Sequence, residues 1–296
     1  NVPYILWSKF IANAFCFGVK NCLISDIFEI FVNLPKLIPS HNMKLKFLGT
    51  GTSQGVPVIG CKCEVCQSQN PKDKRFRASA LITTDSGKKI LIDCGPDFRQ
   101  QMLRERINRL DAVIFTHAHK DHTAGLDDVR SFNFLQQSNM PVYGRPEVLD
   151  QIRIEFAYAF GEHRYPGIPQ IDLYELTLDP FTIKDIEFIP LPVRHLNMEV
   201  LGFRTGNFAY ITDANLIPET TFERLRDVDI LVLNALQRDK HVSHFNLEEA
   251  IQMAKRINAK QTFFTHLSHR MGTHAAVEKE LPSGIRLAYD GLRLTL

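Results

Sequence analysis

Four side chains that commonly bind metal ions lie within six consecutive positions of this chain. They belong to the stretch FTHAHKDHTAGL, residues 115–126, and are His117, His119, Asp121 and His122. Neutral imidazole and carboxylate groups are suitable ligands for Zn, Mn or Fe ions. His117 and His119 are two positions apart, so a turning loop can direct both imidazoles at one ion. Asp121 and His122 are adjacent and would face a second point nearby, so the stretch predicts a metal site rather than a solvated polar loop.

Three further polar residues each follow an apolar run that is typical of a β-strand. His195 follows IEFIPLPVR, Asp213 follows FAYIT, and His266 follows QTFFT. One such residue alone is more often a surface group. Three of them at successive strand ends indicate side chains that meet, because functional residues concentrate where strands pass into loops. We therefore expect these residues to complete a metal site with the first four.

A second candidate metal site is the cysteine-rich stretch QGVPVIGCKCEVCQ. It places Cys61, Cys63 and Cys66 in a C-x-C-x-x-C pattern, and three thiolates at this spacing can bind one ion together with a fourth ligand. One alternative is buried free thiols, which rarely cluster in this way. The other is disulfide bonding, and the absence of a convincing signal peptide argues against it. We expect a structural zinc ion here, with His269 as the fourth ligand. Cys94, at the end of the strand-like run KKILIDC, is expected to pack in the core.

The elements that must position these residues begin at Met43, where short apolar runs alternate with helical patterns. The expected strands cover residues 44–49, 79–84, 88–94, 111–117, 171–176, 185–193, 200–205, 208–212, 229–235 and 261–267. The expected helices cover residues 127–137, 146–160, 218–226, 246–257 and 274–280, with Asn246 as a helix N-cap. Residues 285–296 are expected to form two strands around an Asp-Gly turn. This alternation predicts sheets covered by helices in one compact domain, residues 43–296.

Composition and charge exclude few classes of protein. The chain has 296 residues, a formal net charge of +2, 44% hydrophobic and 23% charged residues, which is ordinary for a folded protein and gives no strong basic field for nucleic acid. Residues 1–42 are rich in Phe, Ile and Leu, but charged residues interrupt every run that could span a membrane. We expect this segment to be an extension outside the domain. The alternative is an amphipathic helix that packs on the domain or on a membrane surface.

Read in order, THAHKDH, the later His195, YITDA and FFTHLSH resemble the metallo-β-lactamase superfamily with its H-x-H-x-D-H motif. The resemblance extends from about Met43 to the end of the chain. It implies an α/β fold, a four-layer αβ/βα sandwich, and two catalytic divalent ions, Zn or Mn, at the edges of the sheets. It also implies the ligand sets. The first ion would bind His117, His119 and His195, the second would bind Asp121, His122 and His266, and Asp213 would bridge both ions.

Additional motifs resemble the phosphoribosyl cyclic phosphodiesterase branch of that superfamily, namely GTGTSQGVP, CKCEVC, THLSH and LPSGIRLAYDG. This resemblance implies a metal-dependent phosphodiesterase that acts on a small cyclic or nucleotide-like phosphodiester. Its catalytic residues would be Asp121, Asp213 and His244. Asp213 would orient the attacking water, and His244 would assist the leaving oxygen. His241 in the same loop is the competing choice for that role, and a solvated loop histidine is the alternative for His244.

The segment FAYAFGEHRYPGIPQ, residues 156–170, has no counterpart in that branch that can be aligned. It looks like a loop over a pocket, where His163, Arg164 and Tyr165 could bind a phosphate or a base. A surface lid without ligand contact is equally compatible with the sequence. Because this loop would set the choice of substrate, the ribose cyclic phosphate of the branch need not be the substrate of this chain.

Other functions on the same site are the alternatives to a phosphodiesterase. A tRNA-processing nuclease would need a long basic arm, which this chain does not show, and a thioesterase would use the same ions. A non-hydrolytic relative in cofactor biosynthesis would fit an incomplete ligand set. We expect a cytoplasmic protein with a small phosphodiester substrate, without a nucleic-acid polymer or a membrane as partner, and a homodimer is compatible with the sequence.

Overall fold

The computed structural model describes residues 43–161 and 165–296, which form two seven-stranded sheets. The first sheet has the order β14-β1-β2-β3-β4-β5-β6, with β1 (Lys44–Gly49), β2 (Ser79–Thr83), β3 (Lys89–Ile92), β4 (Ala112–Ile114), β5 (Met140–Gly144), β6 (Ile171–Glu175) and β14 (Arg293–Thr295). The second has the order β13-β12-β11-β10-β9-β8-β7, with β7 (Phe181–Ile183), β8 (Ile186–His195), β9 (Met198–Thr205), β10 (Phe208–Ile211), β11 (Ile230–Asn234), β12 (Gln261–Thr265) and β13 (Ile285–Leu287). Strands β3 to β6 are parallel to one another, and so are β10 to β13.

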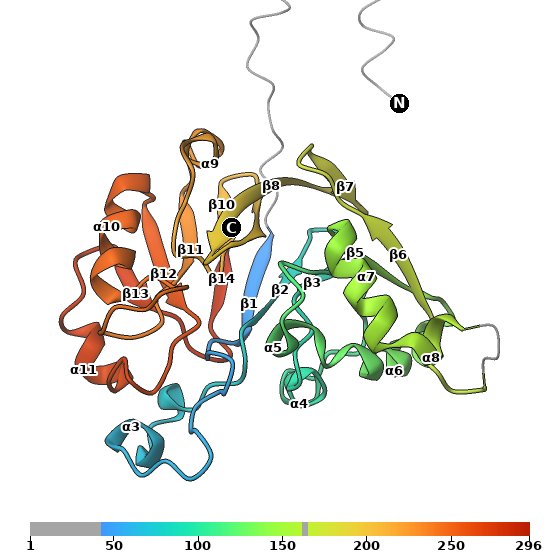
Figure 1. Cartoon of the computed structure of the whole chain (residues 1–296), viewed down its shortest axis with the longest axis horizontal. Helices are drawn as coiled ribbons and strands as arrows, with labels where there is room; N and C mark the ends of the chain where they lie inside the picture. The colour runs from blue at the N-terminus through green and yellow to red at the C-terminus, as the bar shows by residue number, and fades with distance from the viewer. Residues whose placement is uncertain (1–42, 162–164) are drawn as a thin grey trace, which may run out of the picture. The chain divides into compact units, whose positions relative to one another are not determined.

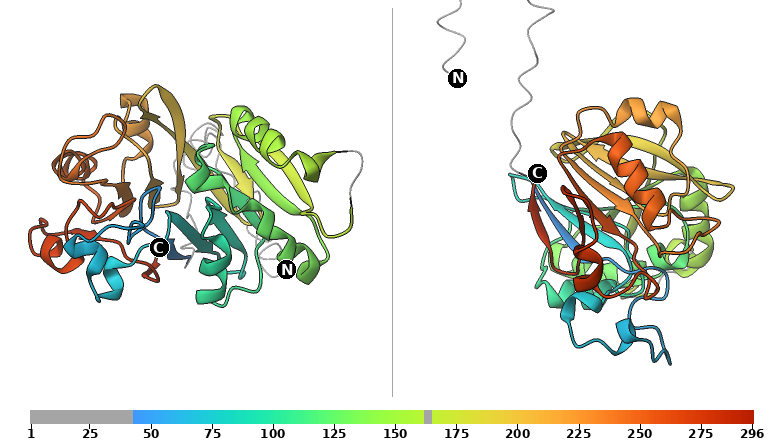
Figure 2. Two further views of the ribbon diagram at one scale, coloured as in Figure 1. Left: turned by 60° about the horizontal axis from the view of Figure 1, so that its bottom comes forward. Right: turned by 90° about the vertical axis from the view of Figure 1, so that its left-hand side faces the viewer.

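Helices cover the outer face of each sheet, as Figure 1 and Figure 2 show. The helices over the first sheet are α4 (Phe98–Arg104), α5 (Lys120–Thr123), η2 (Leu126–Val129), α6 (Arg130–Gln136), α7 (Pro146–Glu155) and α8 (Ala157–Phe160). Those over the second are α9 (Glu219–Arg224), α10 (Leu247–Ile257) and α11 (His274–Glu278). Two short elements, α3 (Glu64–Gln67) and η1 (Pro71–Asp73), lie in the connection between β1 and β2. The expected four-layer sandwich is confirmed.

The two-residue period of the strands divides the apolar residues among three cores. In β2, Ile82 packs between the two sheets with Phe188 and Tyr210 of the second sheet. The adjacent Leu81 points to the opposite face and packs with Phe98 and other residues of the helices over the first sheet. A third core lies between the second sheet and its helices. Each sheet is therefore buried on both faces, and polar side chains gather at the strand ends.

Helix α10 shows how the sequence sets an element boundary. The Asn246 side chain accepts a hydrogen bond from the Glu249 backbone N–H, and the Glu249 carboxylate accepts one from the Asn246 backbone N–H. This capping box satisfies two backbone donors that the first helical turn leaves without partners. The helix ends at Asn258, which adopts a left-handed conformation with φ of 58°. The expected N-cap at Asn246 is confirmed.

The last two strands exist, but they do not pair with each other. β13 pairs with β12 in the second sheet, whereas β14 pairs with β1 in the first. The chain crosses between the sheets at Asp290, whose carboxylate accepts hydrogen bonds from Thr50 Oγ1, the Phe76 backbone N–H and Arg104. The Asp-Gly pair, a frequent hairpin turn, here connects opposite sheets.

Several elements were not expected from the sequence, among them β5, β7, α3 and α4. β5 contains Pro141, which cannot donate a hydrogen bond and argues against a central strand. α4 is a two-turn helix between the polar segment after β3 and the loop before β4. No helix in the described part of the chain is long and apolar enough to cross a membrane. The expected N-terminal extension, residues 1–42, lies outside the described residues.

Candidate metal centre

The residues singled out by the sequence lie just past the carboxyl ends of strands from both sheets. His117 follows β4, His195 ends β8, Asp213 follows β10 and His266 follows β12. The carboxyl ends of parallel strands meet at one edge of a sheet, which is where ligands bind in open α/β sheets. All four side chains are buried, with exposed fractions of 6% or less. The fold therefore collects polar side chains from distant parts of the sequence at one place.

Backbone conformation directs two of these side chains. Asp213 and His266 have positive φ values of 53° and 57°, and Asp93 at the end of β3 has a φ of 62°. Non-glycine residues rarely adopt this conformation, and Asp and His are among the types that tolerate it best. Such strain is typical of functional sites, where surrounding contacts hold the backbone in place. The turn ends the strand and leaves each side chain at the sheet edge.

The side chains converge in two overlapping groups. The ligand atoms of the first group lie within 4.8 Å of one another and belong to His117, His119 and His195. The same limit holds for a second group, Asp121, His122 and His266. Asp213 lies between them, since its carboxylate is within 4.8 Å of ligand atoms of His117 and His122 in one direction and of His195 and His244 in another.

The spacing of these atoms fits bound metal ions better than direct hydrogen bonds. Two ligand atoms bound about 2.1 Å from one tetrahedral ion are roughly 3.4 Å apart. His122 Nε2 is 3.3 Å from Asp121 Oδ2 and 3.2 Å from Asp213 Oδ2, and His266 Nε2 is 3.1 Å from Asp213 Oδ1. The Nε2 atoms of His117, His122 and His266 are buried without a hydrogen-bond partner among the described residues. Because unpaired buried polar atoms are costly, these nitrogens are the atoms that could bind ions.

Asp121 and His122 lie in a short helix and not in the expected loop. Residues Lys120–Thr123 form α5, a single helical turn that starts directly after His119. The turn sits against the segment after β3, where the Cys94 backbone N–H donates to the His122 carbonyl at 2.7 Å. Gly95 allows this approach, because a Cβ atom there would lie 2.0 Å from the Asp121 carbonyl oxygen.

Asp93 is a candidate site residue that the sequence analysis did not identify. Its carboxylate lies 2.7 Å from His122 Nδ1 and accepts hydrogen bonds from the backbone N–H and the hydroxyl of Thr116. A carboxylate on the second ring nitrogen of a histidine fixes the tautomer and the ring orientation for metal binding. The signal was a polar residue at the end of the strand-like run KKILID, the same pattern that identified the other candidates. A backbone carbonyl has this role for His195, whose Nδ1 is 2.9 Å from the Ser243 oxygen.

The electrostatics of the centre favour a neutral His117, a protonated His122 and an ionised Asp213. Burial, together with the neighbouring His122, lowers the pKa of His117 well below its usual range. Burial opposes ionisation of Asp213, but His266 and His122 hold the pKa of that carboxyl well below its usual range. Burial also opposes protonation of His122, yet the carboxylates of Asp213 and Asp93 raise its pKa well above its usual value. The protonated His122 balances the negative charge of these carboxylates, and a metal cation at the site would do the same.

His244 lies within the centre and His241 lies at its edge. His244 is buried, and its Nδ1 is 3.6 Å from Asp213 Oδ1. Burial and the nearby His266 lower the pKa of His244 to about 3, so its imidazole is neutral and offers one N–H donor and one acceptor. The ring of His241 is exposed and lies 5.2 Å from the ring of His244. Of the two competing histidines, His244 is the one that contacts the ligand-type residues.

The four residues expected to bind a structural zinc also come together. His269 Nδ1 is 3.3, 3.4 and 3.6 Å from the Sγ atoms of Cys61, Cys63 and Cys66. A nitrogen and a sulfur bound to one tetrahedral zinc ion are separated by roughly 3.6 Å. A hydrogen bond from the Cys66 backbone N–H lowers the pKa of Cys63 to about 6, whereas burial raises the pKa of Cys66 to about 11. The geometry fits a Cys₃His site for one ion, and Cys94 is buried in the core apart from it.

The segment 156–170 is only partly described. His163 and Arg164 lie outside the described residues, and Tyr165 has an exposed fraction of 58%. Some described hydrogen bonds of this segment stay within it, and others join it to neighbouring helices, such as those from Tyr158 Oη to Asp127 and between the Gln170 backbone and Asn133. The proposed contact between this segment and a substrate stays a prediction.

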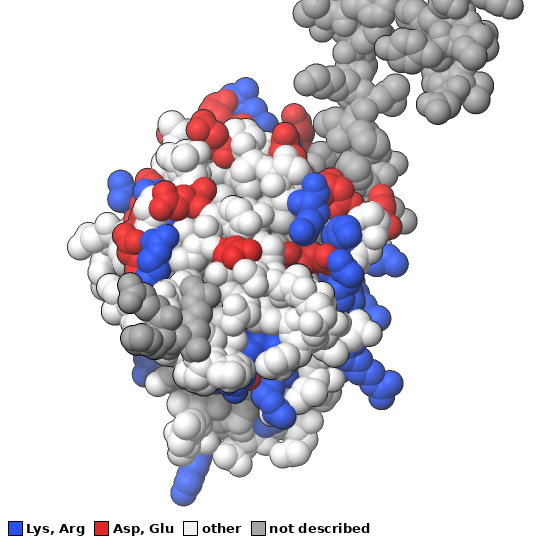
Figure 3. Space-filling view, turned by 90° about the vertical axis from the view of Figure 1, so that its right-hand side faces the viewer, with Lys and Arg blue, Asp and Glu red and all other residues white. Residues whose placement is uncertain are grey.

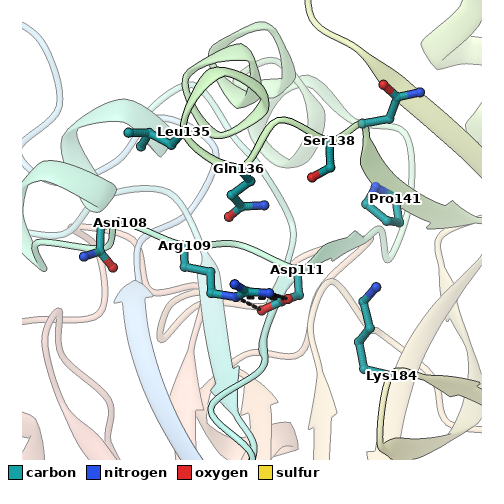
Figure 4. Close-up of a pocket in the computed structure, with 9 residues that line it drawn as sticks. Asn108, Arg109, Asp111, Leu135, Gln136, Ser138, Pro141 and Lys184 are labelled. Atoms are coloured by element: carbon teal, nitrogen blue, oxygen red, sulfur yellow. Dashed lines mark hydrogen bonds and ion pairs between the residues drawn. The ribbon is translucent and has the colours of Figure 1, made fainter.

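A cavity of about 570 Å³ lies near the opposite ends of the strands, beside the start of β4 and β5. Figure 4 shows Arg109 and Asp111 paired within it, and their closest approach is 2.7 Å. The Gln136 side chain is bonded to both the backbone N–H and the carbonyl of Leu110. The polar groups in this cavity are bonded to one another. The ligand-type residues at the carboxyl ends of the strands are therefore the better candidates for a catalytic site.

Known proteins resemble this chain in sequence and in structure. Residues 88–267 match the family model of the β-lactamase superfamily domain. An octanoyltransferase of Porphyromonas gingivalis is 42% identical over 252 residues, which cover 84% of this chain and 51% of that protein. A ribonuclease Z of Bradyrhizobium diazoefficiens is 36% identical over 138 residues, 42% of each chain. This chain thus spans about half the length of the curated relatives that it matches.

A solved structure matches over nearly the whole described part of the chain. The crystal structure of a diphosphatase of the PhnP family superposes with a TM-score of 0.80 at 40% sequence identity. The match covers 86% of this chain and 98% of the diphosphatase. Similarity of this extent, at this level of identity, covers both sheets and the strand ends that carry the cluster.

Proposed function

Because the chain belongs to the metallo-β-lactamase superfamily and has the fold of its metal-dependent hydrolases, we propose that it is a phosphodiesterase with two catalytic metal ions. The observation that carries the proposal is the pair of ligand groups joined by Asp213, since such a pair suits phosphoryl transfer. Similarity to a diphosphatase over 98% of its length supports hydrolysis of a bond to phosphorus. The proposed substrate is a small cyclic or nucleotide-like phosphodiester.

The proposed ligands follow the two groups of converging side chains. One divalent ion, Zn or Mn, would be held by His117, His119 and His195, and the other by Asp121, His122 and His266. Asp213 would contact both. Ions bound there would acidify a bound water and neutralise charge on the phosphoryl oxygens. The Cys₃His group would hold a separate zinc ion with a structural role.

The hydrolysis itself requires two proton movements. One phosphorus–oxygen bond forms to water and another breaks to the leaving oxygen, so the proton that the water releases to solvent balances the one that the leaving oxygen takes up from solvent. The ionised Asp213 carboxylate would orient the water by accepting its hydrogen bond. His244, 3.6 Å from that carboxylate, would donate an N–H hydrogen bond to the leaving oxygen. Asp121 would keep the second ligand group in place.

The first test is hydrolysis of bis(p-nitrophenyl) phosphate by the Mn-loaded protein. The expected result is release of p-nitrophenolate that is lost in a His119→Ala variant with unchanged folding. Metal content of both proteins, measured by mass spectrometry, shows whether the loss follows the metal. No turnover by wild type with both catalytic ions bound would overturn the proposed reaction.

A ribonuclease of the same family is the second candidate, favoured by the 36% identity to a ribonuclease Z. Against it, basic and acidic side chains are intermixed on the face shown in Figure 3, and the net charge is +2. Binding of a tRNA along its phosphate backbone would require a continuous basic surface. Cleavage of a 3′-extended tRNA precursor at rates above those for small diesters would favour this second function.

A further inference from the structure

Three exposed apolar residues lie on adjacent loops beside the candidate metal centre. Leu196, Leu216 and Val242 have exposed fractions of 53%, 50% and 73%. They belong to three different loops, which follow β8, β10 and β11. Single exposed apolar residues are normal on a protein surface, but a group of them at one place suggests a binding surface.

The three loops are held together by one side chain, that of Asn215. The Leu196 backbone N–H donates to Asn215 Oδ1 at 2.9 Å, and Asn215 Nδ2 donates to the Val242 carbonyl at 3.2 Å. The Asn215 backbone N–H donates to the Arg194 carbonyl at 2.9 Å, and the Arg194 N–H donates to the Leu216 carbonyl at 3.0 Å. The loops that carry the three apolar residues are therefore fixed next to one another, and we call Leu196, Leu216 and Val242 the apolar rim.

The rim is continuous with the candidate centre. Leu196 is adjacent to His195, Leu216 lies three residues after Asp213, and Val242 lies two residues before His244. The ligand atoms of those three polar residues lie within 4.8 Å of one another. The His195 ring also contacts the carbonyl of Ser243, the residue after Val242. A molecule whose phosphate lies at the centre would thus bring its ester groups close to the rim.

We propose that the apolar rim binds a flat apolar group, such as a nucleobase or an aryl ring, on the ester that stays bound to the substrate phosphate after the other ester has been cleaved. This inference rests on the proposed phosphodiesterase function and narrows its substrate class. The polar cluster would bind the phosphodiester, while the rim would cover the aromatic face of the ester group. Ligand sites typically combine apolar walls with a few placed polar groups, and covering apolar surface stabilises a complex by about 25 cal/mol per Å².

The experiment compares two substrates that share a leaving group. Bis(p-nitrophenyl) phosphate and methyl p-nitrophenyl phosphate both release p-nitrophenolate, but only the first keeps an aryl group on the phosphate. In a Leu196→Ser/Leu216→Ser/Val242→Ser variant we expect KM for the aryl diester to rise about tenfold, with KM for the methyl diester unchanged within twofold. A third substrate, thymidine 5′-(p-nitrophenyl phosphate), shows whether a nucleobase has the same effect as an aryl ring.

A matched control uses exposed apolar residues elsewhere. Leu103 and Ile154, on α4 and α7, have exposed fractions of 58% and 71%. A Leu103→Ser/Ile154→Ser variant should leave the preference between the two diesters unchanged. Binding of phenylphosphonate and methylphosphonate to the metal-loaded proteins, measured by calorimetry, gives a readout that does not depend on turnover. The rim variant should lose affinity for phenylphosphonate alone.

The outcomes separate the rim from the reaction. If the rim variant keeps the wild-type preference for the aryl over the methyl diester, and for phenylphosphonate over methylphosphonate, the proposed role of the apolar rim in binding is wrong. Equal loss for both diesters assigns the three residues to loop stability instead, and a dimeric wild type with a monomeric rim variant assigns them to a subunit contact. If no diester is cleaved but phenylphosphonate binding still depends on the rim, the phosphodiesterase function fails while the apolar subsite stands.

Discussion

At the scale of single residues, the support around a ligand matters as much as the ligand. Asp93 contacts both His122 and Thr116, and it is fully buried. Its carboxylate fixes which His122 nitrogen faces the centre. His195 is oriented in the same manner by the Ser243 carbonyl. Residues that bind no ion themselves thus determine the geometry that an ion would meet.

Asp93→Asn should weaken metal binding at the centre. An amide cannot replace the charged acceptor of His122 Nδ1, and loss of such partners typically reduces metal affinity by roughly 10–100-fold. Competition with a chromogenic chelator measures the dissociation constant. Asp97→Asn is the matched control, because Asp97 lies nearby but pairs with Arg77 instead. Equal affinities for wild type and Asp93→Asn would refute this role.

Cys63→Ala should remove the structural zinc without removing catalysis. Three ligands would remain, and the purified protein should hold about one zinc ion less per chain. Its Tm should fall by roughly 5–10 °C, since loss of a ligand that binds only the folded state lowers stability. Phosphodiester turnover per folded molecule should stay within about twofold of wild type. Cys94→Ala, a buried cysteine outside this group, should keep its zinc content. A folded Cys63→Ala that is inactive with both catalytic ions bound would contradict a purely structural role.

Residue identity and spacing predicted much of the candidate site because its side chains follow strands. His195, Asp213 and His266 could be selected before the structure was known, since a polar residue after an apolar run marks a strand end. Asp93 satisfies the same criterion, but the predicted strand 88–94 places it inside the strand and not at its end. The contact between Asp93 and His122 joins residues from different loops, so spacing alone could not reveal it.

At the scale of elements, the α5 turn depends on a close approach of two backbones. Gly95 faces the Asp121 carbonyl, and Gly125 faces the Gly95 carbonyl, with a hypothetical Cβ 2.0 Å from the oxygen in each case. Hydrogen bonds on both sides of Cys94, to His122 and from Gly125, close this contact. The helix that carries Asp121 and His122 is therefore held by the segment after β3.

Gly95→Ala should displace α5. A methyl group at 2.0 Å from a carbonyl oxygen forces the two segments apart, and overpacking of this kind typically costs about 1–3 kcal/mol or more. Denaturant unfolding measures the stability, and metal titration measures whether the second ligand group has moved. Gly161→Ala, where the nearest atom to a Cβ is 3.5 Å away, is the control and should change stability by less than about 0.5 kcal/mol.

Asn246→Ala should destabilise α10 at its first turn. The substitution removes the side-chain acceptor of the Glu249 N–H, which typically costs about 0.5–2 kcal/mol. Urea unfolding gives the change in free energy. Glu248→Ala alters an exposed residue of the same turn and should be nearly neutral. Equal costs for the two variants would show that the capping box contributes little.

Some elements were beyond the reach of local patterns. The Asp-Gly pair at 290–291 matches a hairpin turn, but Asp290 bonds to Thr50, Phe76 and Arg104 and ties the chain to the first sheet. Pro141 argued against a central strand, yet β5 pairs on both sides. In each case a tertiary contact decided the structure, and such contacts are not visible in a window of the sequence.

At the scale of the whole molecule, a buried basic pair joins the start of the domain to its end. Arg75 is buried and donates to Thr50 Oγ1 and to the Ala288 carbonyl, and its guanidinium lies 3.3 Å from His274 Nδ1. Burial is the main cause that lowers the pKa of His274 to about 4, and the Arg75 charge adds to it. Lys72 acts in the same direction, whereas Glu278 and Asp73 oppose it.

Stability should therefore depend on pH through His274. The unfolded chain gains a proton near pH 6.5, whereas folded His274 gains one only near pH 4, so protons favour unfolding between these values. The free energy of unfolding should fall by on the order of 1–2 kcal/mol as the pH drops from about 6.5 to 4. His274→Gln should flatten this part of the profile in urea unfolding at several pH values. Profiles of equal slope would contradict the assignment.

The pairing of β14 with β1 also has a consequence for protein synthesis. Lys44 lies opposite Thr295. The pairing between β1 and β14 therefore cannot form until β14, the last strand of the domain, has left the ribosome. Until then, one edge of β1 has no partner strand from this sheet, and exposed edges invite pairing with other chains. Contacts this distant in sequence also slow folding. During translation the nascent chain should therefore depend on chaperones longest at β1, the strand that is made first.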